Sequence, residues 1–288
     1  MEYLIHLAIL VAIYAILSVS LNLVVGYTGL LSVTHAAFYG VGAYATAILL
    51  TRSGWDFLPA LIVGMVLSGI IAFLIGIVLS KFKEDYYALA SLGFNIIVYS
   101  IMLNWQELTR GPLGIPGIYR PNILGLNFTE NWMFLILALV LLIIVYYLSR
   151  SLIHSSFGRV LKAIREDEGA IKIFGYNVSV YKLAIFVIGA MFASIAGSLI
   201  ASYITFIDPS TFTIDESIFI LAIIILGGLA NLRGSIVGAL ILVLLPEALR
   251  FLGLPNDIAA QMRQVIYGVI LILLMLFRPQ GIMGEYKL

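Results

Sequence analysis

Long apolar runs separated by short polar segments dominate this chain. Between Glu2 and Arg52, 49 consecutive residues contain no Asp, Glu, Lys or Arg, and one helix crosses a bilayer with about 20 residues. Two helices are therefore predicted there. The charge-poor runs at 57–80, 86–106, 131–149 and 183–207 each predict one further span, because a helix satisfies its own backbone hydrogen bonds in lipid.

After Glu216 the apolar runs become shorter. They cover 217–229, 235–252 and 264–277, and glycines and prolines interrupt or bound them. The whole pattern predicts an all-α, polytopic membrane helical bundle of about nine spans, with a range of eight to ten. We interpret residues 1–288 as a single transmembrane domain.

Composition supports this class and excludes others. The chain is 62% hydrophobic and 11% charged, against about 25% charged residues in a soluble domain. The net charge of +1 gives no field that would attract nucleic acid. The chain has no cysteine, and its three histidines share no metal-ligand spacing. We therefore expect no metal, no bound cofactor and no catalytic residue.

The basic residues predict the orientation of the spans. Loops 81–85, 150–182 and 230–234, together with the C-terminal tail, hold eleven Lys and Arg residues, and the opposite set of loops holds five. Basic loops stay cytoplasmic. This places 150–182 and the C-terminus in the cytoplasm and the N-terminus outside, provided that 26–50 is a full crossing.

A few uncharged or weakly basic polar residues interrupt the apolar runs. Such side chains either bridge helices or line a path, and both interpretations remain open for Asn22, Ser32, His35, Ser91 and Asn95. Glycines interrupt the runs at 26–32 and at 227–235, where Gly227 and Gly228 are adjacent. Paired interruptions can mark a substrate site in transporters, although flexibility at a helix end explains them equally well.

Two runs carry small residues at every fourth position. They are Gly64, Ser68, Ala72 and Gly76 in one run, and Gly189, Ala193 and Gly197 in the other. Small residues let helix backbones approach closely. We predict tight helix packing at both stripes, with a pore-lining role for the neighbouring serines Ser194, Ser198 and Ser202 as the alternative.

The stretch 154–182 is too polar for lipid. Apolar residues recur there at helical spacing, and the opposite face carries charges of both signs. Gly158 and Gly175 are expected to bracket one short amphipathic helix with a glycine stop. A polar face of mixed sign favours docking to a specific protein over lying on a membrane surface.

Several segments together resemble one known family. They are SLNLVVGYTGLLSVTHAAFYGVGAYATAIL at 20–49, GPLGIPGI at 111–118, GRVLKAIREDEGAIKIFGYNV at 158–178, ILGGLANLRGSIVGA at 225–239 and FRPQGI at 277–282. With them the chain resembles the LivM-like permease subunits of branched-chain amino acid ABC importers. This resemblance extends over nearly the whole chain.

The resemblance implies an ABC importer permease fold in a prokaryotic plasma (inner) membrane and transport by alternating access. The implied partners are a homologous, LivH-like permease, two cytoplasmic ATPase subunits that carry ATP and Mg, and an extracytoplasmic amino-acid-binding protein. It also accounts for the absence of a P-loop from this sequence. The segment 158–175 would be the coupling helix that contacts an ATPase, with Gly158, Arg159, Lys162, Arg165, Glu166, Asp167, Glu168, Ala170 and Gly175 as its candidate residues. In the EAAxxxG pattern of importer permeases, Gly169, Ala170 and Ile171 stand where Glu, Ala and Ala are expected.

Other functions remain as alternatives. The same importer class also handles urea and short amides. A stand-alone channel or secondary carrier would not need the 154–182 segment, and an intramembrane enzyme would need a nucleophile, base or metal cluster that the sequence does not supply.

Overall fold

The predicted runs form helices in the computed structural model, which describes residues 2–82, 84–123, 126–250, 265, 268, 269, 272, 276 and 280–284. The long helices are α1 (Glu2–Thr28), α2 (His35–Ser53), α3 (Phe57–Leu79), α4 (Glu84–Asn104), α6 (Asn131–His154), α9 (Val178–Ile204), α10 (Ile214–Gly227) and α11 (Leu232–Arg250). Shorter ones are α5 (Gln106–Thr109), α7 (Ser156–Glu166) and α8 (Glu168–Ile173), with the 3₁₀ turns η1 (Gly111–Leu113) and η2 (Pro209–Phe212).

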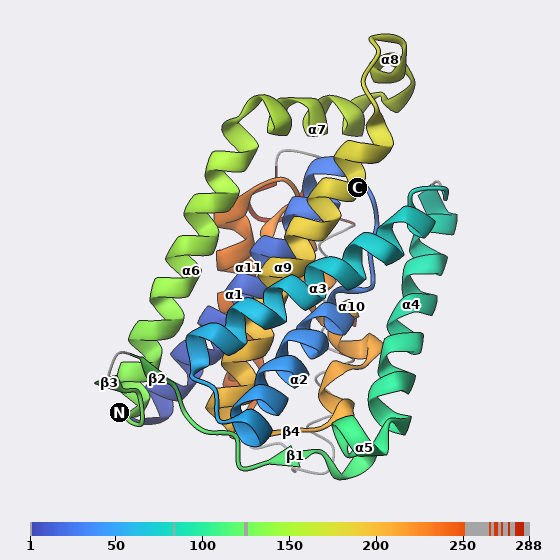
Figure 1. The fold of residues 1–288 in the computed structure, drawn as a ribbon. Coiled ribbons are helices and arrows are strands. Elements are labelled where there is room, and N and C mark those ends of the chain that lie inside the picture. Colours follow the sequence, from blue (N-terminus) through green and yellow to red (C-terminus); the bar gives the residue numbers. More distant parts are fainter. Residues whose placement is uncertain are drawn as a thin grey trace.

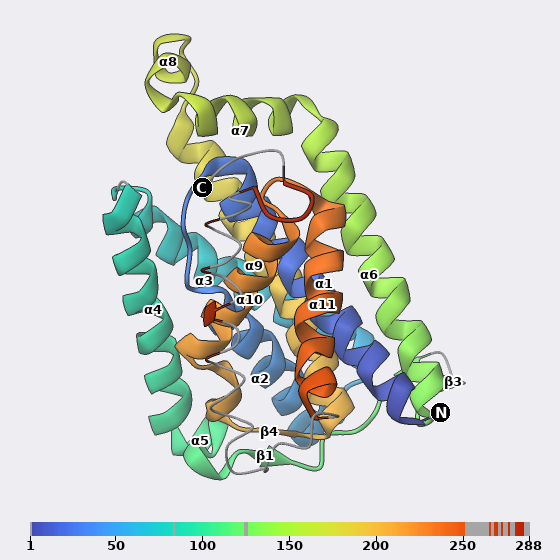
Figure 2. The same cartoon turned by 180° about the vertical axis from the view of Figure 1, so that it is seen from behind.

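Two of the five helices that could each cross a membrane alone, α9 and α1, are the most buried, and α2 is likewise largely buried. In the most apolar stretch of α9, 72% of the residues are buried, and in that of α1, 61%, against 39% for α3 and α6 and 28% for α4. Figures 1 and 2 show α4 at one edge and α6 at the opposite edge. The outer helices present large apolar side chains, such as Leu74 on α3 and Leu89 on α4, that are more than half exposed. Such faces suit lipid as the surrounding solvent.

Small residues bring α2, α3 and α9 into close contact, as predicted. A β-carbon added at Gly197 of α9 would lie 2.0 Å from the carbonyl oxygen of Tyr39 on α2. The Ser68 hydroxyl of α3 donates a hydrogen bond to the Ala190 carbonyl of α9 at 2.9 Å. On the serine stripe, Ser198 is buried and accepts a hydrogen bond from Thr46 at 2.7 Å. These serines pack between helices in this conformation.

Irregular segments close one end of the bundle. Four two-residue strands lie there: β1 (Ile115–Pro116) pairs antiparallel with β4 (Phe206–Ile207), and β2 (Asn122–Ile123) pairs antiparallel with β3 (Leu126–Asn127). Arg52 reaches across from the end of α2 to the carbonyl of Leu108 at 3.1 Å. The start of α1 is at the same end, where His6 hydrogen-bonds Tyr203 of α9 at 2.6 Å.

The other end of the bundle carries α7 and α8 (Figures 1 and 2). The end of α1, the turn between α10 and α11 and the segment 280–284 also lie there, since Ile282 N–H donates to the Leu226 carbonyl at 2.9 Å. The end of α3 and the start of α4 lie toward this end too (Figures 1 and 2), so the described parts of the four loop groups that sequence predicts as basic and cytoplasmic lie at one end. The N-terminal end of α1 lies at the opposite end.

The number of spans is only loosely supported. Among the described residues, five helices are long and apolar enough to cross a membrane alone: α1, α3, α4, α6 and α9. The pair α10 and α11 would make a sixth; it bends by 119° at 228–231 and forms either a broken span or a re-entrant hairpin. α2 is too polar to qualify, and most of the ninth predicted span, 264–277, lies outside the described residues.

Candidate functional site

The polar segment at 154–182 forms two short helices, so the prediction of one helix bracketed by Gly158 and Gly175 is wrong. Ser155 begins α7, because its hydroxyl accepts a hydrogen bond from the Gly158 N–H at 3.3 Å. Asp167 then ends α7 and starts α8, where its carboxylate accepts from the Ala170 N–H at 2.9 Å. An Asp that caps a new helix leaves the helical conformation itself, which breaks the segment.

Two glycines serve this geometry differently. Gly158 lies inside α7, where an added β-carbon would be 2.1 Å from the Ile153 carbonyl oxygen, so it permits α7 to turn sharply across the end of α6. Gly175 follows α8 with a φ of 86° and nothing near its β-position. There the backbone conformation requires glycine.

Basic residues of α7 attach it to the end of α1. The Arg165 guanidinium donates a hydrogen bond to the Gly26 carbonyl, and the Lys162 ammonium lies 5.7 Å from the centre of the Tyr27 ring. A cation near the C-terminal carbonyls of a helix is electrostatically favourable. These two candidate coupling residues therefore contact this chain's own transmembrane part.

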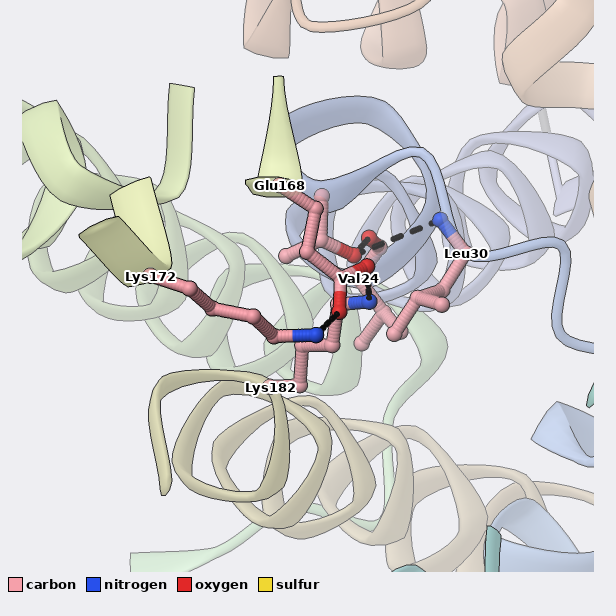
Figure 3. A network of polar contacts seen from close by, with 6 residues as sticks. Val24, Leu30, Glu168, Lys172 and Lys182 are labelled. Carbon is pink, nitrogen blue, oxygen red and sulfur yellow. Dashed lines mark hydrogen bonds and ion pairs between the residues drawn. The ribbon is translucent and has the colours of Figure 1, made fainter. Parts of the chain in front are cut away.

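Glu168 links α8 to α9. Its carboxylate pairs with Lys172 at 2.7 Å and with Lys182 of α9 at 2.5 Å (Figure 3). Partial burial raises the pKa of Glu168, but the hydrogen bonds and charges of the two lysines outweigh it, so the pKa lies below its ordinary value. The carboxylate is thus held ionised at neutral pH.

The remaining charges and the end of α8 face outward. Arg159, Glu166 and Asp167 are exposed, and α8 is the part of the chain farthest from the bundle (Figures 1 and 2). At its end, Ile173 is 87% exposed and Phe174 is 77% exposed. Exposed apolar residues rimmed by charge are typical of a protein contact surface.

Inside the bundle, the linker 29–34 joins α1 to α2 and is held by polar side chains of α4 and α10. Ser91 of α4 accepts a hydrogen bond from the Val33 N–H at 3.0 Å, and the Asn95 side-chain amide donates to the Val33 carbonyl at 2.9 Å. The same amide group donates to the Ser217 hydroxyl of α10 at 2.7 Å, which also accepts from the Ala36 N–H at 2.9 Å.

This linker cluster contains four of the predicted pathway residues: Ser32, His35, Ser91 and Asn95. Ser32 lies 2.9 Å from the Thr34 hydroxyl, and His35 Nε2 lies 2.7 Å from the hydroxyl of Ser20. No side chain among the four is more than 2% exposed. His35, Ser91 and Asn95 here join separate elements, whereas the Ser32 hydroxyl bonds within the linker. The Asn95 Oδ1 atom is buried without a hydrogen-bond partner among the described residues.

Asn22, Gly227 and Gly228 form a second cluster, at the α7 end of the bundle. The Asn22 amide donates to the Ser235 hydroxyl at 2.6 Å and to the Gly228 carbonyl at 3.3 Å. Its oxygen accepts from the Ala230 N–H at 2.9 Å. The Gly227 carbonyl accepts from the N–H of Met283 at 3.0 Å. One buried amide thus ties the α10–α11 turn to α1.

Sequence reasoning missed the partners in these clusters. Ser20 hydrogen-bonds His35, and Ser217 and Ser235 each accept a bond from a predicted residue or its neighbour. Each of these serines places a hydroxyl in an apolar run, which is the same signal that indicated Ser91. Because serine is common in membrane helices, this signal alone does not distinguish them from other serines. Among the described residues no group of three or more His, Asp or Glu side chains could hold a metal ion.

Comparison with known proteins gives a family and several relatives. Residues 3–275 match the family described as branched-chain amino acid transport system / permease component. The chain is 34% identical to the high-affinity branched-chain amino acid transport system permease protein LivM of Escherichia coli, over 97% of this chain and 69% of that protein. It is 28% identical to the probable LivM of Methanocaldococcus jannaschii, over 95% of this chain and 91% of that protein.

More distant relatives include the LivH permease of Escherichia coli, at 25% identity over 94% of this chain and 91% of that protein. No solved structure matches. Several helices are long and apolar enough to cross a membrane, and the family match covers nearly the whole chain. Both findings indicate a multi-pass membrane protein. The chain therefore belongs to the permease component family of branched-chain amino acid transport systems.

Proposed function

We propose that this chain is the transmembrane permease subunit of an ATP-driven importer that moves branched-chain amino acids across a prokaryotic plasma membrane. The family match over residues 3–275 carries this proposal. Its relatives LivM and LivH are both named as permeases of such systems. The complete importer would contain a homologous second permease, two cytoplasmic ATPase subunits and an extracytoplasmic binding protein, with the α7 end facing the cytoplasm.

In this proposal, α7 and α8 receive the motion of an ATPase subunit. The exposed end of α8, with Ile173 and Phe174, would contact that subunit. Arg165 connects α7 to the end of α1, and Glu168 connects α8 to Lys182 of α9. Displacement of α7 and α8 would therefore act on α1 and α9, the most buried of the five helices that could each cross a membrane alone.

The linker cluster would line the pathway when α4 and α10 separate. Ser217 and Asn95 join these two helices through one hydrogen bond of 2.7 Å. Its opening would expose hydroxyls, amides and His35, which suit the ammonium and carboxylate groups of an amino acid. The surrounding apolar residues suit an aliphatic side chain, and urea or a short amide is the second candidate substrate.

The coupling role is tested by replacing Ile173 and Phe174 with serine and measuring ATP hydrolysis and uptake by the reconstituted complex. We expect uptake and substrate-stimulated hydrolysis to fall together, because the contact with the ATPase is lost. Leu113 is the matched control, since it is 81% exposed at the opposite end of the bundle. Unchanged ATP-dependent uptake in the double variant would refute the coupling role of α8.

Substrate and energy source are tested with the same vesicles. Uptake of leucine, isoleucine and valine that requires ATP supports the proposal. Uptake of urea without leucine would assign the second substrate class. Leucine uptake without ATP or ATPase subunits would identify a stand-alone carrier.

A further inference from the structure

A basic pocket opens at the α7 end of the bundle, between α1, α6 and α11. Its volume is about 250 Å³, slightly below the roughly 300–1,000 Å³ that pockets for drug-sized ligands occupy. Tyr27, Tyr146, Arg150, His154, Asn231 and Arg233 supply its polar lining. The pocket lies outside the linker cluster and outside the exposed end of α8.

The charge of this pocket is of one sign. Arg150 reaches it from α6 and Arg233 from α11, and no Asp or Glu of the described residues lines it. Both arginines are exposed, and neither guanidinium forms an ion pair with a described residue. Two guanidinium groups around a small cavity fit the oxygens of a phosphate group, which arginine can bind through two parallel hydrogen bonds.

The surface next to the pocket is apolar. On α6, Ile143, Ile144 and Tyr147 are 52%, 46% and 63% exposed. At 1.5 Å per residue they lie within about 11 Å of Arg150 along the helix, toward the middle of the bundle. A ligand with a phosphate in the pocket and acyl chains along α6 would satisfy both surfaces, whereas a free phosphate ion would use only the first.

We propose that this pocket binds the phosphate headgroup of an anionic phospholipid, with Arg150 and Arg233 as its ligands and the outer face of α6 as the surface for the acyl chains. Basic pockets between transmembrane helices on the cytoplasmic side are suited to such headgroups. The bound lipid would brace the ends of α6 and α11 beside the turn that Asn22 holds. The proposal does not depend on which substrate is transported.

The test is native mass spectrometry of the full chain, purified in detergent and mixed with phosphatidylglycerol and phosphatidylcholine of identical acyl chains. We expect the wild-type chain to retain phosphatidylglycerol in preference to phosphatidylcholine. Arg150→Gln with Arg233→Gln should weaken phosphatidylglycerol retention by roughly fivefold per arginine, hence up to about 25-fold, without changing phosphatidylcholine retention.

Two further variants distinguish charge at the pocket from charge in general. Lys81→Gln removes an exposed cation that follows α3, whose end lies toward the same end of the bundle (Figure 1), and that does not line the pocket. This change should leave retention unchanged. Arg150→Lys with Arg233→Lys keeps the charge but loses the paired hydrogen bonds of the guanidinium groups, so it should retain more phosphatidylglycerol than the glutamine variant and less than the wild type. Unchanged phosphatidylcholine retention by the double glutamine variant shows that its loss of phosphatidylglycerol is not caused by misfolding.

Three results would overturn the proposal. The first is equal retention of phosphatidylglycerol by the wild type and the double glutamine variant. The second is displacement of phosphatidylglycerol by millimolar inorganic phosphate, which would show a site for the free ion. The third is loss of ATPase-subunit binding in the double glutamine variant with lipid retention unchanged, which would show a protein contact.

Discussion

Asn22 provides the sharpest test of the structure. It is fully buried in α1 and is the hydrogen-bond partner of the Ala230 N–H and the Gly228 carbonyl in the α10–α11 turn. Asn22→Ala removes the amide and leaves these two backbone groups without that partner. The same amide also bonds the Asn231 carbonyl and the Ser235 hydroxyl, so the perturbation is confined to the contact of α1 with the α10–α11 turn and the start of α11.

The magnitude follows from the bonds lost. Interhelical hydrogen bonds in membrane proteins average about 0.6 kcal/mol and reach about 1.7, and a buried donor left unpaired costs about 1–3 kcal/mol. The Asn22 side chain makes four such bonds, and at about 0.6 kcal/mol each their loss destabilises the closed turn by about 2 kcal/mol. At 1.4 kcal/mol per factor of ten, the open population rises about 30-fold.

Cysteine labelling measures that population, because the chain has no native cysteine. Leu229 lies in the turn and is 3% exposed, so Leu229→Cys is labelled by a maleimide only when the turn opens. We expect Asn22→Ala to raise the labelling rate about 30-fold in this background. Asn104→Ala is the control, since Asn104 is exposed and bonds only within its own helix. A labelling rate that Asn22→Ala leaves unchanged would refute the role of Asn22 in closing the turn.

Three further predictions concern packing, charge and capping. Gly197→Ala should lower the free energy of unfolding in SDS by about 1–3 kcal/mol, because the new methyl group meets the Tyr39 carbonyl. Gly93→Ala is the control: its β-position faces open space, so it should be neutral or stabilising. Equal effects of the two changes would contradict the packing of α2 on α9. Glu168 is partly exposed, so Glu168→Gln should lower the free energy of unfolding by at most about 1 kcal/mol. Since the pKa of Glu168 is lowered in the fold, the difference in thermal midpoint between wild type and variant should be present at neutral pH and disappear as pH falls below the ordinary value of 4.5. A difference that grew in acid would contradict the ion pair. Asp167→Ala should speed hydrogen exchange in α8 by about fivefold, the equivalent of about 1 kcal/mol for a lost N-cap. Asp167→Asn keeps a capping side chain and should exchange slowly. Equally fast exchange in both variants would show that Asp167 does not cap α8.

The sequence alone predicted the positions of the long helices. Apolar runs at 57–80 and 86–106 became Phe57–Leu79 and Glu84–Asn104, because in lipid any long apolar segment must form a helix to satisfy its backbone. The sequence also predicted that 154–182 lies outside the lipid and that the small-residue stripes pack closely against other helices. Each of these signals is contained within one segment of the chain.

Tertiary structure decided the contacts between segments. Arg165 is a candidate coupling residue from the sequence, and only the fold shows that its guanidinium bonds the Gly26 carbonyl, because the end of α1 comes within its reach in the folded bundle. Ser217 gains its role by facing Asn95 on another helix. A polar residue in an apolar run needs a hydrogen-bond partner, but the helices that pack together determine which residue that partner is. That is the physical reason why the sequence determined the helices and the folded bundle decided what Asn22 and Asn95 hold in place.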